Sequence, residues 1–474
     1  MKSASQAADL IKKQVQNGGF IHVVSHLDAD GLAAAGIIGS ALARLDATFR
    51  IRIQRWIDEK IVDGILADKP SLIIFTDFGS GDLDVLNSRL TYRETVILDH
   101  HQPLCEADPA FVHVNPHLFG IDGSRDLSGA GAAYFVAKAL DKANCDLAAV
   151  AVVGALGDLQ DKYEQRRLGG PNAIILEDAL NAGCLKIETD LMFFGRETRP
   201  IHQALARTTT PFIPGISGEE DKSLAFLASL GITPKKGDKW RALRDLSEDE
   251  KKKLFNALAD YLMSKGSFGD VALGLRGSVY TLTNEEPWTS LRDAREFSVL
   301  LNATGRMDKP GVGVAICMGD RGAALEQASV VLEEYRGVIT KYLNWLLEPE
   351  TGRMEEFGHI WVAHGDNVID DKIIGTLSSI LSTTLVNPEK PIIAYSTVQG
   401  EGIAKFSARG IDSLVKKGLD LGEVLRISAE KYGGRGGGHD IAAGAQVPLE
   451  HAGSFLKQID ELVKRQLAGE SLGG

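Results

Sequence analysis

The stretch Ile97-Leu98-Asp99-His100-His101 places a short apolar run directly before one carboxylate and two imidazoles. Together with Thr95-Val96, the apolar residues predict a buried strand, and the polar triplet then stands at its carboxyl end. Three adjacent ionisable side chains are costly to bury unless a metal ion or another charged partner satisfies them. The stretch is therefore predicted to be the centre of a divalent-metal site.

The residues around this stretch alternate between strand-like and helix-like segments from 20 to 160. Strands are expected at 20–24, 72–75 and 95–98, and helices at 32–45, 130–140 and 147–156. Short continuous apolar runs between helices indicate a mostly parallel sheet that is covered on both faces. The predicted fold class is therefore α/β, and ligands in such a fold gather at the carboxyl ends of the strands.

Further carboxylates follow the other expected strands. His26-Leu27-Asp28-Ala29-Asp30-Gly31 follows the first strand, and Asp77 follows the second. In an extended segment the residues at positions i and i+2 face the same way, so His26, Asp28 and Asp30 are expected to point together. Two carboxylates that close cannot both ionise cheaply unless cations hold them. These residues extend the predicted metal site.

Each of these carboxylates also has a simpler interpretation. Asp30 can cap a helix that starts at Leu32. Asp77 can be a turn residue, and Asp158, in Leu156-Gly157-Asp158, can be a solvated helix end. Four segments of one predicted α/β domain nevertheless present Asp or His at the end of a strand or helix, and this favours the metal site.

The type of ligand indicates the type of metal. Oxygen and imidazole ligands without thiolate favour Mn²⁺ or Mg²⁺ over structural zinc. Two such ions about 3.5–4 Å apart form a clamp for phosphoryl transfer. The predicted chemistry is therefore phosphoester hydrolysis with two Mn²⁺ ions, or with Mg²⁺ as the alternative.

Length and composition allow two or three domains, each with its own core, in 474 residues with a net charge of −12. This charge argues against a protein that coats nucleic acid with its whole surface, although a local basic groove remains compatible with it. No apolar run reaches membrane-spanning length, and the N-terminus does not read as a signal peptide, so we expect a cytoplasmic protein. The four cysteines, Cys105, Cys145, Cys184 and Cys317, are widely spaced and are expected to be buried thiols.

Several segments resemble the four motifs of the DHH phosphoesterase superfamily, namely His26-Leu27-Asp28-Ala29-Asp30-Gly31, Asp77, Asp99-His100-His101 and Gly157-Asp158. That superfamily includes RecJ exonucleases, nanoRNA and cyclic-dinucleotide phosphodiesterases, and manganese-dependent inorganic pyrophosphatases. The resemblance implies one metal held by His26, Asp28 and Asp77, and a second held by Asp30, Asp77, His100 and Asp158. It also implies that His101 faces the scissile phosphate, and that Asp99 supports the metal shell from behind. The implied catalytic residues are His101, Asp77 and Asp99.

A second resemblance lies near the C-terminus. Gly433-Gly434-Arg435-Gly436-Gly437-Gly438-His439, read as a glycine-rich turn and followed by Ala442-Ala443-Gly444, is similar to the signature of the DHH-associated domain. Consecutive glycines let backbone N–H groups approach an anion, and charged neighbours add hydrogen-bond donors. The substrate contacts implied by this resemblance are Arg435, Gly437, Gly438 and His439, with Ser407 and Arg409 from the segment 405–409.

A third resemblance narrows the choice within the superfamily. The segment 301–307, Leu-Asn-Ala-Thr-Gly-Arg-Met, resembles one that is characteristic of RecJ nucleases, with Thr304 where Ala is usual. It implies a phosphate contact for Arg306. An inserted middle segment without the C-terminal OB domain of bacterial RecJ resembles the archaeal RecJ-like proteins that associate with the GINS replication complex. The helical periodicity of 319–347 predicts a long connecting helix.

These observations predict four parts: a DHH domain with the metal site over 1–196, an inserted subdomain over 197–290, a RecJ-like segment with a connecting helix over 291–350, and a DHH-associated substrate-binding domain over 351–474. Within the insertion, Ser247 and Glu250 predict the capped start of a helix. Strands are expected at 359–363, 392–395 and 402–407 of the last part.

The resemblance implies an exonuclease that degrades single-stranded DNA, 5′ to 3′, or single-stranded RNA, in replication or repair. Two basic and aromatic clusters are candidate strand-binding surfaces or solvated faces: Arg50, Arg52, Arg55 and Trp56, and Lys235, Lys236, Lys239, Trp240, Arg241 and Arg244. One alternative is a replisome scaffold, bound to GINS and the replicative helicase, with secondary catalysis. Another is a phosphodiesterase that cleaves oligoribonucleotides or cyclic dinucleotides.

Overall fold

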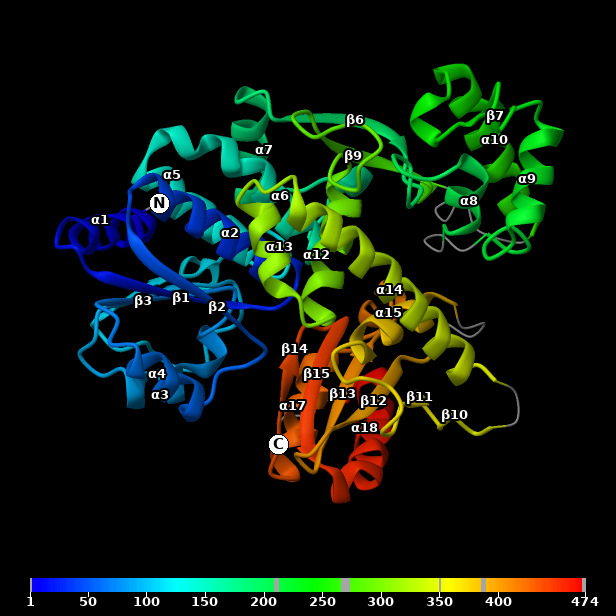
Figure 1. Ribbon diagram of the computed structural model, residues 1–474. Helices are drawn as coiled ribbons and strands as arrows, with labels where there is room; N and C mark the ends of the chain where they lie inside the picture. The colour runs from blue at the N-terminus through cyan, green and yellow to red at the C-terminus, as the bar shows by residue number, and fades with distance from the viewer. Residues whose placement is uncertain (1, 209–212, 266–272, 349–350, 385–388, 471–474) are drawn as a thin grey trace. The chain divides into compact units, whose positions relative to one another are not determined.

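The computed structural model describes residues 2–208, 213–265, 273–348, 351–384 and 389–470 (Figure 1). The described residues form two compact units, the first ending at Glu333 and the second beginning at Glu334. The division falls within the long helix α14 (Ala323–Leu346), which matches the helix expected over 319–347.

The first unit is built on a five-stranded sheet in the order β2-β1-β3-β4-β5, in which every strand is parallel to its neighbours. The strands are β1 (Phe20–His26), β2 (Thr48–Gln54), β3 (Leu72–Thr76), β4 (Thr95–Leu98) and β5 (Phe111–Val114). All residues of β3 and β4 are buried, as the continuous apolar runs predict. The α/β fold class and the parallel sheet are confirmed.

The two edge strands, β2 and β5, are absent from the sequence-based prediction. In β2 arginines alternate with apolar residues, so the segment reads as a charged cluster, whereas it forms an edge of the sheet. Arg50 of this strand pairs with Asp68 at 2.8 Å. Because β2 precedes β3, Asp77 follows the third strand of the chain and Asp99 the fourth, one place later than expected.

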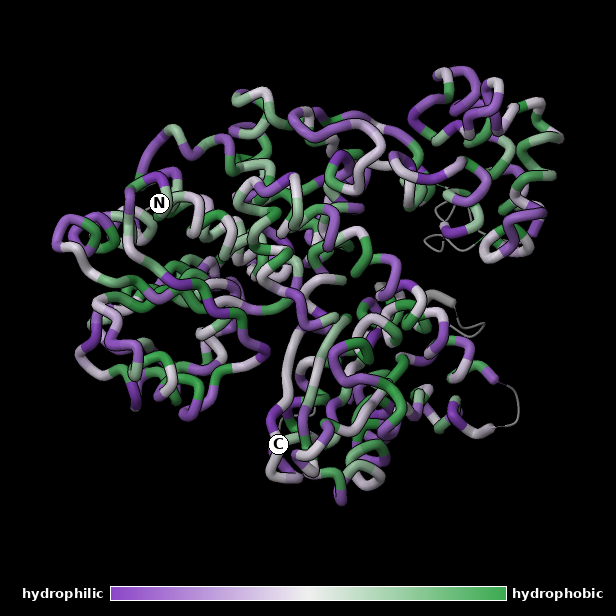
Figure 2. The backbone as a smooth tube through the Cα atoms, in the orientation of Figure 1, coloured by the Kyte–Doolittle hydropathy of each residue, from purple (hydrophilic) through white to green (hydrophobic). Residues whose placement is uncertain are grey.

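Helices cover both faces of this sheet (Figure 1). One face carries α1 (Lys2–Gln16), α2 (Ala29–Arg44) and α5 (Gly129–Leu140), and the other carries α3 (Glu59–Ala67) and α4 (Leu83–Arg89). α6 (Ala148–Gly157) packs against both α2 and α5. Every residue of α2 from Ala29 to Leu42 is buried, and Figure 2 shows the hydrophobic residues concentrated along the strands beneath it.

The first unit also contains α7 (Pro171–Asn181), α12 (Ala294–Arg306) and α13 (Pro310–Cys317). Two antiparallel strands, β6 (Leu185–Leu191) and β9 (Arg276–Leu282), enclose the segment between them. That segment comprises α8 (Ile201–Ala206), α9 (Glu220–Ser229), β7 (Lys235–Lys236), β8 (Lys239–Trp240) and α10 (Glu248–Ser264). It has its own apolar core, which includes Leu205, Leu227 and Leu258.

The predicted cap at the start of α10 is confirmed. The Ser247 hydroxyl accepts a hydrogen bond from the Glu250 backbone N–H at 3.2 Å, and the Glu250 carboxylate accepts one from the Ser247 N–H at 2.8 Å. The described part of the chain also has short 3₁₀ helices at Ser80–Asp82, Pro116–Phe119, Lys142–Leu147, Glu164–Arg166, Leu243–Asp245 and Leu449–His451.

The second unit is a six-stranded mixed sheet in the order β10-β11-β12-β13-β15-β14. Its strands are β10 (Met354–Glu356), β11 (Trp361–His364), β12 (Ile392–Val398), β13 (Ile403–Arg409), β14 (Arg435–Gly438) and β15 (Ala442–Pro448). Its helices are α15 (Ile374–Thr384), α16 (Asp412–Val415), α17 (Leu421–Lys431) and α18 (Ala452–Leu467). The strands expected at 359–363, 392–395 and 402–407 correspond to β11, β12 and β13.

The glycine-rich segment 433–438 is not only a turn, because Arg435–Gly438 forms the edge strand β14. A Cβ on Gly436 would lie 2.5 Å from the Leu425 carbonyl oxygen of α17. The glycine therefore lets helix and strand backbones approach closely, which a turn assignment does not anticipate.

No described helix is both long enough and apolar enough to cross a membrane. All four cysteines are free thiols, as expected, but only Cys184 and Cys317 are buried. Cys105 is exposed and Cys145 is half-buried, which corrects the expectation for these two residues.

Candidate metal centre

The predicted ligands meet at the carboxyl edge of the central sheet. His26 is the last residue of β1, Asp77 follows β3 directly, and Asp99 begins the triplet that follows β4. Asp158 caps the C-terminal end of α6. Strand ends and a helix end therefore bring together residues more than 100 positions apart in the sequence, as the parallel sheet predicts.

One group of side chains comprises His26, Asp28 and Asp77, whose ligand atoms lie within 4.8 Å of one another. His26 Nδ1 is 2.9 Å from Asp28 Oδ2 and 3.6 Å from Asp77 Oδ2. Asp28 is also the N-cap of α2, because its Oδ1 accepts a hydrogen bond from the Gly31 N–H at 3.0 Å. The two oxygens of Asp28 thus serve different purposes, one for the helix and one for the group.

This geometry corrects the expected start of the helix. α2 begins at Ala29 and not at Leu32, and the capping residue is Asp28 and not Asp30. Asp30 lies in the first turn of α2, so the run from His26 to Gly31 is not extended throughout.

A second group comprises Asp30, His100 and Asp158. His100 Nε2 is 3.1 Å from Asp158 Oδ2, 3.2 Å from Asp77 Oδ1 and 3.8 Å from Asp30 Oδ2. The other ring nitrogen, Nδ1, donates a hydrogen bond to the Gly123 carbonyl at 2.7 Å. In the neutral ring this bond leaves the lone pair on Nε2, the nitrogen that could bind a metal.

Asp77 connects the two groups. Its Oδ2 faces His26 and its Oδ1 faces His100, and the residue is 1% exposed. Its backbone has φ of +63°, an unfavourable conformation for a residue with a side chain, which is found most often at functional sites. A single carboxylate therefore presents one oxygen to each group.

Four buried polar atoms of the two groups, which face each other in pairs at 3.2 and 3.6 Å, form no hydrogen bond of good geometry with any described residue: His26 Nδ1, Asp77 Oδ1, Asp77 Oδ2 and His100 Nε2. Buried polar atoms are almost always satisfied, so four unsatisfied atoms that converge on one place indicate a missing partner. A cation is the partner that suits lone pairs of carboxylate and imidazole.

The charges of the site lead to the same conclusion. Burial, followed by the negative charges of Asp77 and Asp158, raises the pKa of Asp30 well above its ordinary value. Burial and the charge of Asp28 likewise raise the pKa of Asp77. Four carboxylates (Asp28, Asp30, Asp77 and Asp158) carry the charge that two divalent cations would neutralise, and the residues therefore fit a two-metal site.

Asp30 is held in place by the N-terminal end of α5. Its Oδ2 accepts a hydrogen bond from the Gly129 N–H at 2.6 Å, and its Oδ1 accepts one from the Ala130 N–H at 3.0 Å. The positive end of a helix dipole stabilises a carboxylate in this position. The helix therefore fixes the orientation of Asp30.

Two glycines make the close packing around these carboxylates feasible. A Cβ on Gly129 would lie 2.6 Å from Asp77 Oδ1, and a Cβ on Gly154 would lie 2.4 Å from Asp30 Oδ1. Sequence reasoning missed both glycines, because only the tertiary contact distinguishes them from other helical glycines.

Asp99 lies behind the site and organises the triplet. It is fully buried, and its Oδ1 accepts hydrogen bonds from His101 Nδ1 at 2.8 Å and from the His100 N–H at 2.7 Å. Its Oδ2 accepts one from the Ser80 N–H at 2.8 Å. Although burial alone would raise the pKa of Asp99, His101 and these hydrogen bonds lower it below its ordinary value. Asp99 is thus an ionised anchor for the half-exposed ring of His101.

The segment 301–307 contacts the loop that carries Asp28 and Asp30. Asn302 and Gly305 lie on α12, and the Asn302 Oδ1 accepts a hydrogen bond from the Ala29 N–H at 3.1 Å. Thr304 is fully buried, and its hydroxyl donates a hydrogen bond to the Leu301 carbonyl at 2.8 Å. The buried hydroxyl therefore finds its hydrogen-bond acceptor within α12. Arg306, the predicted phosphate contact, is the last residue of α12.

The remaining predicted site residues lie in the second unit, where the structure gathers them on neighbouring strands. Ser407 and Arg409 lie on β13, and Arg435, Gly437 and Gly438 lie on β14, with β15 between the two strands. His439 follows directly in the turn to β15. The Ser407 and Ser378 hydroxyls are 2.9 Å apart, and Arg409 Nε donates to the Ser379 hydroxyl at 2.8 Å.

Three family models match the chain. The model of the DHH family, N-terminal domain, matches residues 20–155, that of the DHH-CID domain matches 193–271, and that of the DHHA1 domain matches 358–465. An uncharacterized protein of Methanocaldococcus jannaschii is 31% identical over an alignment of 475 positions, which covers 98% of this chain and 99% of that protein. The single-stranded-DNA-specific exonuclease RecJ of Escherichia coli is 23% identical over 100% of this chain and 71% of its own length.

Two solved structures have a similar fold. RecJ of Thermus thermophilus in complex with Mn²⁺ has a TM-score of 0.59 at 19% identity, over 98% of this chain and 55% of that protein. The chain thus spans about half the length of this RecJ. CDC45 of Entamoeba histolytica has a TM-score of 0.63 at 11% identity, over 98% of this chain and 99% of that protein.

Proposed function

The chain belongs to the DHH family, and from this premise we propose that it is a two-metal phosphodiesterase that degrades single-stranded nucleic acid from one end. The observation that carries the proposal is the position of Asp77, whose Oδ2 faces His26 of one ligand group and whose Oδ1 faces His100 of the other. Such a bridging carboxylate is what a pair of divalent ions needs, and phosphoryl transfer is a reaction that such pairs promote.

The ligands proposed for the first ion are His26, Asp28 and Asp77, and those for the second are Asp30, Asp77, His100 and Asp158. When bound, two Mn²⁺ or Mg²⁺ ions would supply Lewis acidity for the phosphate and activate the attacking water. The protein fixes the ligands beforehand, since α5 holds Asp30 and the Gly123 carbonyl holds His100.

His101 is proposed to contact the scissile phosphate. With Nδ1 bound to Asp99, Nε2 is the ring nitrogen that remains to meet a substrate. Burial and the neighbouring His100 oppose a positive charge on this ring, but Asp99 keeps the pKa of His101 above its ordinary value. The ring can therefore donate a charge-assisted hydrogen bond to a phosphate oxygen.

The choice of a nucleic-acid substrate rests on two supports. The E. coli RecJ that matches over the whole chain is described as specific for single-stranded DNA. The segment 301–307 resembles the one that is characteristic of RecJ nucleases. We propose 5′-to-3′ degradation of single-stranded DNA in replication or repair, with single-stranded RNA as the competing substrate.

The other predicted contacts remain part of this proposal. Arg306 in the first unit is proposed as a phosphate contact, and the substrate contacts proposed in the second unit are Ser407, Arg409, Arg435, Gly437, Gly438 and His439. The four-part division into 1–196, 197–290, 291–350 and 351–474 is likewise proposed as the functional organisation.

The test is digestion of end-labelled single-stranded DNA and RNA by the full chain, with a dinucleotide as a third substrate. We expect Mn²⁺-dependent shortening of the long strands, no activity in EDTA, and a loss of more than about a hundredfold in Asp77→Asn. Asp46→Asn is the matched control, because Asp46 also has a positive φ (+54°) but lies on the surface. Full hydrolysis by Asp77→Asn, or faster turnover of the dinucleotide alone, would contradict the proposal.

A scaffold for GINS and a replicative helicase is the second candidate, favoured by the fold shared with CDC45 over nearly the whole length of both chains. A purely structural role does not require the ligands, yet all six of the proposed metal ligands are present. Retention of GINS or helicase subunits by the full chain in a native pull-down would support scaffolding beside catalysis.

A further inference from the structure

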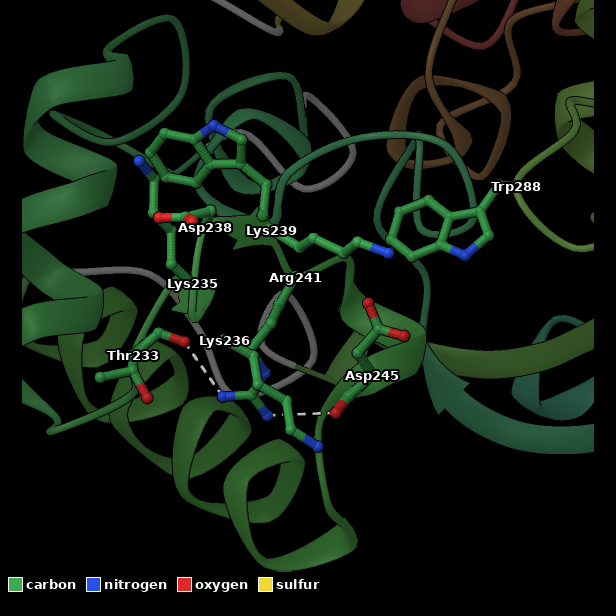
Figure 3. A pocket seen from close by; sticks show the side chains of 9 residues that line it. Thr233, Lys235, Lys236, Asp238, Lys239, Arg241, Asp245 and Trp288 are labelled. Carbon is green, nitrogen blue, oxygen red and sulfur yellow. Dashed lines mark hydrogen bonds between the residues drawn. The ribbon is translucent and has the colours of Figure 1, made fainter.

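A groove of about 990 Å³ lies in the first unit, far along the sequence from the metal ligands (Figure 3). It is lined by the hairpin of β7 and β8, and also by Thr233, Arg241, Asp245 and Trp288, the last from the loop after β9. The metal groups do not use these residues, most of which belong to the second basic and aromatic cluster of the sequence.

The hairpin carries the ammonium groups of three lysines, Lys235, Lys236 and Lys239. Lys236 and Lys239 stand directly opposite each other across a two-residue turn, where Gly237 has φ of +63°. Like charges in directly opposite positions destabilise a hairpin. Among the residues that the structure describes, neither lysine forms an ion pair. The hairpin therefore keeps an unfavourable charge pair that an anion would relieve.

Of the other charged side chains of the groove, Arg241 and Asp245 are already engaged, and Asp238 adds one carboxylate beside the lysines. Arg241 binds both carboxylate oxygens of Glu250, at 2.9 and 2.6 Å. The Asp245 carboxylate accepts a hydrogen bond from the Ala242 N–H at 2.8 Å. Asp238 lies at the turn itself. The groove therefore offers Lys236 and Lys239, and Lys235 beside them, to a ligand.

Two tryptophans add exposed aromatic surface. Trp240 is 41% exposed, with the Lys235 ammonium 4.3 Å from its ring centroid, and Trp288 is 47% exposed. The Arg244 guanidinium lies 4.2 Å from the ring centroid of Trp288 and is itself bound to Glu197 at 3.2 Å. One face of the Trp288 ring is therefore supported from within the protein.

Trp288 is also held in an unfavourable backbone conformation. Its φ is +68°, which is strained for a bulky residue and is found most often at binding and active sites. Figure 3 shows the side chain of Lys239 extending toward Trp288. The strain, the exposure and the neighbouring charge together mark Trp288 as a platform for a flat ligand.

We propose that this groove is an accessory binding site for single-stranded nucleic acid, with phosphates at Lys236 and Lys239 and a base stacked on Trp288. Positive charge that follows the backbone, combined with aromatic rings that stack on bases, is how proteins bind single strands without sequence preference. An acidic peptide would satisfy the lysines but would leave the exposed surface of the indole rings uncovered. The inference extends the proposed function, on which it rests for the choice of polymer.

The test is binding of a fluorescein-labelled oligothymidylate to the full chain, measured by fluorescence anisotropy in EDTA at several salt concentrations. Trp288→Ala should weaken binding about tenfold without changing the salt dependence, and Trp288→Phe should restore most of it. The plot of the logarithm of the binding constant against the logarithm of the salt concentration has a negative slope. Lys236→Ala/Lys239→Ala should make this slope less steep by about 1.4, since two phosphate contacts are lost. The matched control is Lys252→Ala/Lys253→Ala, which removes the same charge from exposed positions of α10 and should bind like the wild type.

Circular dichroism of each variant verifies that the fold is intact. Equal binding by the wild type and both groove variants overturns the proposal, as does displacement of the strand by polyglutamate at a lower concentration than by unlabelled oligothymidylate. Because EDTA prevents hydrolysis, the outcome is independent of catalysis: an inactive protein that binds through the groove contradicts only the proposed function. An active protein whose groove variants bind normally contradicts only this inference.

Discussion

The side-chain oxygen of Asn302 accepts a hydrogen bond from the backbone N–H of Ala29 at 3.1 Å, across 273 positions of sequence. Ala29 stands between Asp28 and Asp30, two of the proposed metal ligands. One turn further along α12, a Cβ on Gly305 would lie only 1.7 Å from the Leu27 carbonyl oxygen. The segment 301–307 thus packs directly on the loop that carries Asp28 and Asp30, where it would position these two proposed ligands.

Asn302→Ala should therefore weaken Mn²⁺ binding by about 10–100-fold, as the loss of a group that orients metal ligands generally does. The Ala29 N–H would lose its acceptor, although no ligand is removed. Asn302→Asp keeps an oxygen acceptor and should retain most of the affinity. Isothermal titration measures the Mn²⁺ affinity of the two variants. If Asn302→Ala bound Mn²⁺ with the affinity of the wild type, the positioning role would be refuted.

The adjacent histidines 100 and 101 should respond differently to the same substitution. His100→Ala removes a proposed ligand and should lower the number of bound Mn²⁺ ions. His101→Ala should keep both ions but lose about 10²–10⁴-fold in hydrolysis, because the phosphate contact is lost. Metal content by atomic absorption, measured beside activity, separates the two. Loss of metal in His101→Ala would assign this residue to the metal shell.

Gly154→Ala tests the close packing behind Asp30. The new Cβ would lie 2.4 Å from Asp30 Oδ1 and 2.5 Å from the Ala130 Cβ, so it should cost about 1–3 kcal/mol of stability and displace the carboxylate. Gly337→Ala is the matched control, since Gly337 is an exposed position within α14 with nothing within 4 Å of its added Cβ. It should stabilise the protein by about 0.5–1 kcal/mol. Calorimetry measures the stability of both variants, and titration measures their affinity for Mn²⁺. If Gly154→Ala had the stability and the Mn²⁺ affinity of the wild type, the packing argument would be contradicted.

The insertion should lose local stability in acid through one ion pair. Hydrogen bonds from Arg241 lower the pKa of Glu250 to about 2. The pKa of Glu250 in the folded protein lies below its ordinary value of 4.5. The pair with Arg241 therefore stabilises the insertion fully above about pH 4.5, and this stabilisation is lost as the pH falls toward 2. Hydrogen exchange of α10 should therefore accelerate over this interval in the wild type.

Glu250→Gln should abolish that pH dependence, because the neutral amide does not titrate. Glu248→Gln is the matched control on the same helix turn, since the Glu248 side chain is 90% exposed. In this variant, hydrogen exchange of α10 should still accelerate as the pH falls, as in the wild type. An α10 whose exchange has the same pH profile in the wild type and in Glu250→Gln would exclude this pair as the cause.

The sequence predicts those features that depend on local pattern. The run Thr95-Val96-Ile97-Leu98 matches β4 residue for residue, because a short strand that is buried on both faces is largely apolar. The ligands that follow β1, β3 and β4 meet because parallel strands end at one edge. The cap at Ser247 is equally local, since it involves residues only three positions apart.

The remaining features depend on contacts that local pattern does not encode. Aspartate is a common helix-capping residue, so Asp28 and Asp30 are both possible caps. Only the fold shows that Asp28 caps α2, whereas Asp30 accepts a hydrogen bond from the first residue of α5. The glycine run at 433–438 reads as a turn, yet Gly436 is required where α17 packs on β14. Tertiary packing brings Asn302 to Ala29, and the hydrophobic periodicity of the sequence does not predict this contact.

The most direct test of the central claim is the number of Mn²⁺ ions bound by the full chain at equilibrium dialysis. The bridging position of Asp77 predicts two ions per chain in the wild type and in Asp46→Asn, and fewer than two in Asp77→Asn. Two ions retained by Asp77→Asn, or a wild-type protein that binds none, would contradict a centre built around this carboxylate.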